Sequence, residues 1–213
     1  MSTVWRHFPP HDIPPTHVYR ATGQGLTCAL TFDDGPNGEH TSRLLDYLAS
    51  RGIRAVFAVV GECIEANGGA ELLRRIVADG HQLCNHSTSF ADMGDMTAAD
   101  VREDMVRNLE IIRAAVGDVD VPYWRAPNGS WGVTESVATE LGMRPLAVIN
   151  HIGDWATQDV DVLAQRLRTV ATPGQLVLAH DGGGDRAGTV TAVEIVVDEL
   201  LASGWTFTLP AAH

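Results

Sequence analysis

The chain has 213 residues, with 15 basic and 27 acidic side chains, so its formal net charge is −12. This acidic balance, without any cluster of basic residues, excludes a nucleic-acid surface, because binding phosphates requires massed cations. Every apolar run is much shorter than the roughly 20 residues that a membrane-spanning helix needs. At about 150 residues per domain, the length predicts a single domain. The charge and the short apolar runs predict neither a nucleic-acid nor a membrane partner.

The N-terminus lacks the charged start and apolar stretch of a secretory signal peptide. This favours a cytoplasmic protein as written, or a secreted one if a leader has been removed. The cysteines show no CxxC spacing, so neither a disulfide framework nor a zinc knuckle is predicted. Residues 1–24 are rich in Pro and His and predict an extended arm, and residues 25–213 predict the single folded domain. Three histidines of this arm are expected to be exposed and without function: His7, His11 and His17.

Short apolar runs that favour β-strands alternate along the chain with amphipathic segments that favour helices. The predicted strands cover residues 26–32, 54–60, 82–85, 121–125, 145–150, 175–180 and 205–209. The predicted helices cover residues 40–50, 70–78, 97–116, 132–141, 159–171 and 189–203. This alternation predicts an α/β fold with a parallel sheet, and both a barrel-like closure and an open doubly wound sheet fit it.

The clearest predicted helix begins at Thr97. Thr97 and Asp100, three residues later, resemble a capping box in which Asp replaces the usual Glu or Gln. Apolar side chains then keep a helical period as far as Val116, and Gly117 supplies the stop.

Polar side chains gather at the ends of the predicted strands, where the active sites of parallel α/β proteins form. Asp33 and Asp34 follow the first strand, and two adjacent carboxylates are costly unless a cation or a partner neutralises them. Later strand ends carry Asn85-His86-Ser87, Arg125-Ala126-Pro127-Asn128, Asp154-Trp155 and His180-Asp181. Each motif alone is compatible with a turn, a cap or a structural histidine. Their occurrence at five strand ends of one chain favours a common active site.

The order of these motifs resembles that of the polysaccharide deacetylases, carbohydrate esterase family 4, with their nodulation-type deacetylase domain. The resemblance spans about residues 26–209 and rests on TFDDGP at 31–36, NHS at 85–87, RAP at 125–127, DW at 154–155 and LVLAHD at 176–181. It implies a single-domain distorted (β/α)7 barrel. It also implies a metal-dependent removal of acetyl groups from N- or O-acetylated sugars.

The resemblance further implies a role for individual residues. Asp33 resembles the catalytic base that takes a proton from water, Arg125 the residue that holds this base, and His180 the general acid for the leaving group. Asp34 and His86 resemble the ligands of one divalent metal ion. The implied contacts with the substrate are the backbone N–H of Asn128, in place of the family's Tyr, and the side chains of Trp155 and Leu178. Asp154 is a further candidate contact, and Trp131 or Trp124 could offer a stacking surface for a sugar or belong to the core.

The sequence departs from the family at Phe90, where the resemblance implies a second metal-binding His four residues after His86. The ion could be held by Asp34 and His86 with additional water, or by a substitute ligand, with Asp92 as first candidate and His40 or Asp95 behind it. The ion could also be lost, which would leave a glycan-binding protein. A site rich in oxygen ligands and water disfavours closed tetrahedral Zn²⁺ coordination and binds metal weakly. We expect one weakly held ion, with Zn²⁺, Co²⁺, Ni²⁺ and Mn²⁺ as candidates.

A second departure concerns the residue that orients His180. The resemblance implies an Asp three residues before the Asp-Trp pair, and this position is His151. We expect either that Asp154 takes over part of this role or that His180 is supported differently. In either case we expect the pH optimum of the activity to be shifted.

The sequence therefore predicts a metal-dependent hydrolase that removes acetyl groups from an N-acetylated, chitin-like glycan. The alternatives are an acetylxylan esterase, a deacylase of a small intracellular acylated metabolite, and a non-catalytic glycan-binding relative. The predicted site does not separate an amide from an ester substrate, because the same acid and base serve both reactions.

Overall fold

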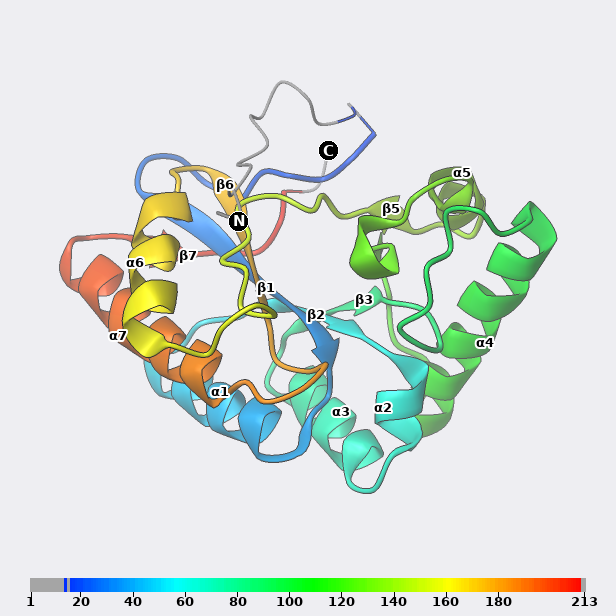
Figure 1. Cartoon of the computed structure of the whole chain (residues 1–213), viewed down its shortest axis with the longest axis horizontal. Helices are drawn as coiled ribbons and strands as arrows, with labels where there is room; N and C mark the ends of the chain where they lie inside the picture. Colours follow the sequence, from blue (N-terminus) through cyan, green and yellow to red (C-terminus); the bar gives the residue numbers. More distant parts are fainter. Residues whose placement is uncertain (1–13, 15, 212–213) are drawn as a thin grey trace.

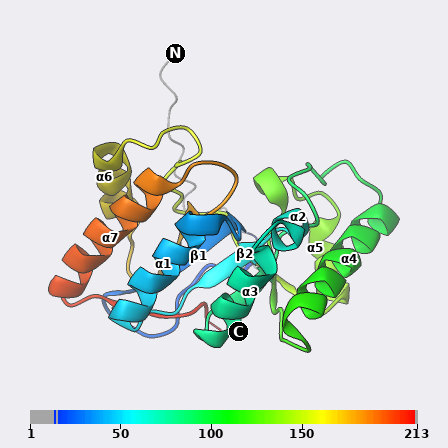
Figure 2. The ribbon, with the colours of Figure 1, turned by 90° about the horizontal axis from the view of Figure 1, so that it is seen from below.

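The structure is a computed structural model and describes residues 14 and 16–211. Its strands are β1 (Thr27–Gly35), β2 (Val56–Val59), β3 (Gln82–Asn85), β4 (Tyr123–Trp124), β5 (Arg144–Pro145), β6 (Gln175–His180) and β7 (Thr206–Phe207). They form one parallel sheet in the order β5-β4-β3-β2-β1-β6, and β7 pairs with the start of β1. The sheet runs through the middle of the molecule, and the helices lie along its outer side (Figures 1 and 2).

The helices are α1 (Gly38–Arg51), α2 (Gly61–Glu65), α3 (Gly69–Ala78), α4 (Ala98–Val116), α5 (Thr134–Glu140), α6 (Val160–Val170) and α7 (Ala187–Ala202). Because side chains alternate along a strand, β1 sends Leu30 and Phe32 into the large core beneath the helices. Thr31 and Asp33 lie on the opposite, inner face of the sheet. This alternation places the carboxylate of Asp33 inside the barrel.

The barrel closes between β5 and β6 through single bridges rather than through a continuous ladder. The chain at 18–21 lies between these two edges: the Val18 N–H donates to the carbonyl of Pro145 (2.8 Å), and the Leu176 N–H donates to that of Tyr19 (3.2 Å). His151 and Leu178 form a further isolated bridge. The predicted α/β fold, a distorted barrel in a single domain, is confirmed.

Several boundaries differ from the prediction. The strand expected at 145–150 is limited to Arg144–Pro145, because the following chain pairs only through isolated bridges. Helix α2 was not predicted, since its five residues are too short to show a helical period. The helix beginning after Thr97 is confirmed: the Thr97 hydroxyl accepts a hydrogen bond from the Asp100 N–H (3.2 Å), and Gly117 follows its last residue.

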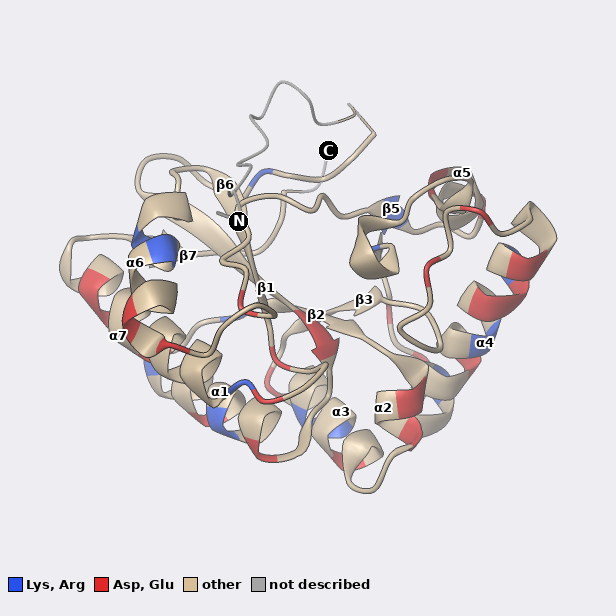
Figure 3. Ribbon diagram, in the orientation of Figure 1, with Lys and Arg blue, Asp and Glu red and all other residues tan. Residues whose placement is uncertain are grey.

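The expectation for the arm histidines is wrong for His17 and untested for the other two. His17 is only 3% exposed, and its ring lies edge-on against the ring of Trp131 with centroids 4.6 Å apart. His7 and His11 lie outside the described residues. Within the described chain no helix is long and apolar enough to cross a membrane. Figure 3 shows acidic residues spread over the outer helices, with basic residues among them.

Candidate active site

The parallel register brings the predicted site residues together at the carboxyl ends of the strands. Asp33 on β1 pairs with His180 on β6, and β1 also pairs with β2. Beyond β2 lies β3, which ends immediately before His86, and then β4, which ends immediately before Arg125. Residues separated by almost 150 positions in the chain therefore meet at one end of the sheet.

Asp33 and Arg125 form an ion pair in the interior of the barrel. The Arg125 Nη1 donates to Asp33 Oδ1 (2.5 Å), and the side chains of Arg125 and Asp33 are 0% and 4% exposed. Other guanidinium nitrogens donate to the carbonyls of Leu146 (3.3 Å) and Ala147 (3.0 Å). A buried ion pair is stable only when such additional bonds satisfy its remaining polar atoms. The arrangement engages one oxygen of Asp33, while Oδ2 lies 3.8 Å from His86 Nε2.

Asp34 and His86 present a carboxylate oxygen and an imidazole nitrogen to each other. Asp34 Oδ1 lies 3.3 Å from His86 Nε2, and His86 Nδ1 bonds to the carbonyl of Arg125 (2.7 Å). Because a carbonyl only accepts hydrogen bonds, Nδ1 carries the proton of the neutral ring and the Nε2 lone pair faces Asp34. Burial opposes ionisation of Asp34, but when His86 is protonated instead, Nε2 donates to Asp34, and this hydrogen bond and the charge of the ring lower the pKa of Asp34 overall.

The backbone of this pair is held in uncommon conformations. Asp34 has φ 74° and Ser87 has φ 71°, in the left-handed region that most residues avoid. Asn85 supports the second turn, because its Oδ1 accepts hydrogen bonds from the Ser87 N–H (3.1 Å) and from Asn108 Nδ2 (2.7 Å). Asn108 was missed by the sequence reasoning. Its signal is a polar residue within the buried face of the amphipathic helix α4.

His180 is held by Asp154. Its Nδ1 bonds to Asp154 Oδ1 (2.8 Å), and its backbone N–H donates to Oδ2 (2.8 Å), which also accepts from the Thr189 hydroxyl (3.0 Å). Asp154 is 1% exposed, so the structure places it behind the imidazole rather than at a surface that a substrate would reach. These contacts match the expectation that Asp154 takes over the orienting role that the resemblance implies for an Asp at position 151.

The environment of His180 favours the protonated ring. Burial opposes the positive charge, but the hydrogen bond and charge of Asp154, with contributions from Asp33 and Asp34, raise the pKa of His180 overall. Burial likewise opposes ionisation of Asp154, and its bonds to His180 lower its pKa. The pair can therefore keep a proton on His180 above the pH at which a free imidazole loses it.

The remaining predicted substrate contacts lie at different depths. Trp155 is 56% exposed, and its ring lies 5.4 Å from that of His180, whereas Leu178 is buried within β6. Trp131 packs against the core and against the ring of His17. Asn128, with φ 55° in a 3-10 turn, donates its side-chain amide to the carbonyl of Phe90 (3.0 Å) and to Asp92 Oδ1 (2.9 Å).

None of the predicted substitute ligands completes a three-residue metal site. Asp92 is exposed and bonded to Asn128, Asp95 is exposed, and His40 Nε2 lies 3.3 Å from Asp185. Among residues 14 and 16–211, no group of three His, Cys, Asp or Glu side chains could hold a metal ion. Phe90 is 37% exposed and lines a pocket of about 730 Å³. The chain thus offers two converging donors, from Asp34 and His86.

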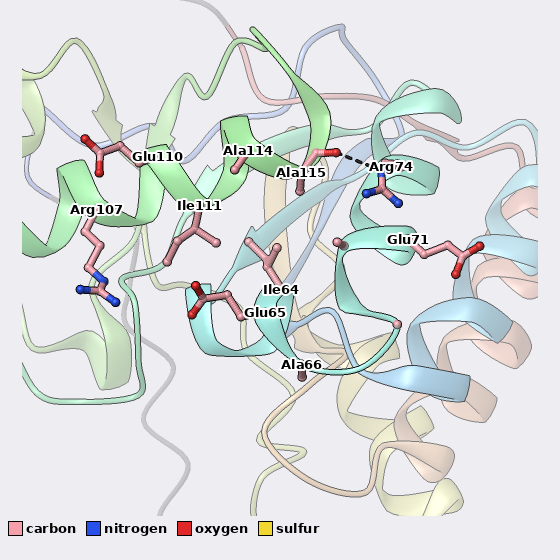
Figure 4. Close-up of a pocket in the computed structure, with 12 residues that line it drawn as sticks. Ile64, Glu65, Ala66, Glu71, Arg74, Arg107, Glu110, Ile111, Ala114 and Ala115 are labelled. Atoms are coloured by element: carbon pink, nitrogen blue, oxygen red, sulfur yellow. Dashed lines mark hydrogen bonds between the residues drawn. The ribbon is translucent and has the colours of Figure 1, made fainter.

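A further pocket of about 700 Å³ lies between α2, α3 and α4 (Figure 4). Ile64 and Ile111 lie within it, and charged side chains such as Glu65 and Arg107 surround them. None of the predicted site residues lines this pocket. The catalytic candidates therefore gather at the strand ends and not in this helical groove.

Comparisons with known proteins agree with the geometry. A family model described as polysaccharide deacetylase matches residues 20–146. A chitooligosaccharide deacetylase of Sinorhizobium fredii is 33% identical over 72% of this chain and 71% of its own length. A peptidoglycan-N-acetylglucosamine deacetylase of Bacillus cereus is 28% identical over 84% of each chain. A solved family 4 acetyl xylan esterase from Clostridium thermocellum, in complex with a cobalt ion, matches with a TM-score of 0.76 and 28% identity, over 86% of this chain and 87% of that one.

Proposed function

Since the chain belongs to the polysaccharide deacetylase family, we propose that it is a metal-dependent hydrolase that removes acetyl groups from an N-acetylated, chitin-like glycan. The observation that carries this proposal is the meeting of three pairs at one end of the sheet: Asp33 with Arg125, Asp34 with His86, and His180 with Asp154. They supply a base, a pair of metal donors and an acid.

In this proposal Asp33 and His180 move the protons of the reaction. Asp33, held through Oδ1 by Arg125, uses Oδ2 to take a proton from the water that attacks the acetyl carbon. His180 Nε2 donates a proton to the sugar nitrogen as the C–N bond breaks, while Asp154 fixes the ring through Nδ1. Acetate and a free amine result. The backbone N–H of Asn128 is proposed to face the oxygen of the tetrahedral intermediate.

Asp34 and His86 fit a divalent ion because the lone pair of His86 Nε2 and a carboxylate oxygen converge, while the other ring nitrogen is fixed by a carbonyl. When bound, such an ion polarises the acyl oxygen and lowers the pKa of a coordinated water. Two protein donors leave several positions for water or substrate. We therefore propose that the ion is weakly held and exchangeable.

A glycan substrate is supported by the space and the aromatic surfaces near these pairs. The pocket of about 730 Å³ lies beside Asp34: none of the six paired residues lines it, but Gly183 does, and a Cβ added at Gly183 would meet the Asp34 carboxylate. A pocket of this size accommodates a ligand as large as a sugar unit. On the His180 side, the exposed ring of Trp155 offers a flat apolar surface.

Acetate release from chitooligosaccharides and from acetylated xylan, measured in parallel, tests the proposal against its alternatives. Faster release from chitooligosaccharides supports amide hydrolysis, and faster release from xylan favours the acetylxylan esterase. Binding of either glycan without release favours a non-catalytic glycan-binding protein. Release only from small acylated metabolites favours the intracellular deacylase.

The Asp154→Asn variant should shift the pH dependence of turnover. A general acid acts in its protonated form, so kcat falls as the pH rises through the pKa of His180. Because the hydrogen bond and charge of Asp154 raise this pKa, their removal should move the alkaline limb of the kcat profile to lower pH. The exposed Asp161→Asn is the matched control. An unchanged alkaline limb in Asp154→Asn would show that His180 is not the acid.

The Phe90→His variant should bind metal more tightly. If Phe90 occupies the position of a third ligand beside Asp34 and His86, a second imidazole should increase the affinity for Zn²⁺ or Co²⁺ by about tenfold or more. Calorimetry on chelator-stripped protein measures the change, and Phe90→Leu controls for the loss of the aromatic ring. Equal affinities of the His and Leu variants would contradict this placement.

A further inference from the structure

A buried cation that the proposed mechanism does not use lies behind the candidate site. Arg186, immediately before α7, is 5% exposed. Its nitrogens donate to four backbone carbonyls, those of Gly182 (2.7 Å), Gly183 (3.1 Å), Asp154 (3.2 Å) and Asp185 (3.2 Å). Within the described part of the chain, no carboxylate forms an ion pair with it. Its positive charge helps to lower the pKa of Asp34 and of Asp154, although its hydrogen bonds go to carbonyls. Burial of a guanidinium is costly unless its donors are satisfied, so these four contacts merit a functional explanation.

One of these contacts reaches the residue that orients the acid. The carbonyl of Asp154 accepts from Arg186 Nη1 and also from Gln158 Nε2 (2.8 Å). The side chain of the same Asp154 holds both the ring and the backbone N–H of His180. Arg186 therefore fixes the main chain of the residue whose carboxylate aims the imidazole.

Two other contacts reach the loop that supports the metal-side carboxylate. Gly182 and Gly183 lie directly against Asp34: an added Cβ at Gly182 would overlap the backbone oxygen of Asp34, and one at Gly183 would overlap its Oδ2. Gly183 also has φ 71°, which glycine adopts without strain. The carbonyls that Arg186 binds thus belong to residues that pack on both the main chain and the carboxylate of Asp34.

We propose that Arg186 is a positioning residue of the reaction, whose single guanidinium ties the segment that orients His180 to the glycine loop that supports Asp34. It thereby sets the spacing between the acid and the carboxylate side of the site. This inference rests on the proposed deacetylation. Lysine cannot replace the arginine, because only a planar guanidinium fork reaches carbonyls of two segments at once.

The first test is independent of activity and uses the pKa of His180, followed by NMR titration of its ring. The groups that face His180 and raise its pKa are Asp154, Asp33 and Asp34. In Arg186→Gln the pKa should fall, since a displaced Asp154 binds the ring less well, whereas loss of a nearby positive charge alone would raise it. A pKa that is unchanged or higher overturns the proposal. Because this measurement needs no turnover, failure of the proposed function remains a separate result.

The second test is kinetic. Turnover of chitooligosaccharide by Arg186→Gln and by Arg186→Lys should fall by about 10- to 100-fold, with KM within about twofold of wild type, because the groups that react lose their alignment. Arg168→Gln, which removes a surface ion pair between Arg168 on α6 and Glu199 on α7, should leave kcat unchanged. Full turnover in Arg186→Lys, or a change confined to the unfolding midpoint in all Arg186 variants, overturns the positioning role.

Discussion

Replacing Asp33 with Asn should lower the rate of acetate release by about 1,000-fold, within the range expected for removal of a general base. Asn is nearly isosteric, and its amide oxygen can still accept the hydrogen bond that Arg125 Nη1 donates to Oδ1. The group that accepts the proton of the attacking water is lost. The affinity for chitooligosaccharide should therefore stay within about twofold of wild type, and calorimetry together with an acetate assay separates the two quantities.

The exposed Asp118→Asn is the matched control for this substitution and should keep full activity. Asp33→Asn with undiminished acetate release would show that Asp33 is not the base. Loss of binding together with loss of release would assign Asp33 to substrate recognition instead.

Replacing Arg125 with Met should destabilise the fold by about 3–5 kcal/mol, the usual cost of removing one partner from a buried ion pair. Arg125 is 0% exposed, and Asp33, Thr31 and the carbonyls of Leu146 and Ala147 all lose a donor. Activity should fall as well, because the base is no longer held. Urea unfolding measures the free-energy change.

A double variant tests the physical reason for this cost. Asp33→Asn combined with Arg125→Met leaves no uncompensated carboxylate. The double variant should therefore lose less unfolding free energy than the two single variants lose in sum. Arg168→Met, at an exposed ion pair, controls for the loss of a guanidinium. Its free energy of unfolding should stay close to that of the wild type. Additive effects of Asp33→Asn and Arg125→Met would contradict the assignment of the ion pair.

The location of the site could be predicted from the sequence because parallel strands align their carboxyl ends. Asp33 and His180 each end an apolar run, and the structure pairs them across β1 and β6. Their neighbours His86 and Arg125 directly follow β3 and β4. For these residues, position along a strand determines position in space.

The supporting residues could not be predicted in the same way. Asp154 lies in a loop, and only the fold shows that both of its oxygens face His180. Asn108 lies on α4, and Arg186 immediately precedes α7. At both positions the sequence pattern does not reveal which buried carbonyl or amide the polar side chain reaches. The same holds for barrel closure, in which the chain at 18–21 joins two sheet edges through isolated bridges.

The central claim is metal-assisted deacetylation by this site, and acetate release from chitooligosaccharide by chelator-stripped protein tests it most directly. Zn²⁺, Co²⁺, Ni²⁺ or Mn²⁺ would be added back singly to wild type and to Asp34→Asn. We predict that the stripped protein is inactive, that at least one ion restores release in wild type, and that Asp34→Asn needs much higher metal concentrations or stays inactive. Full release by the stripped protein, or equal restoration of both proteins at the same metal concentration, would contradict the claim.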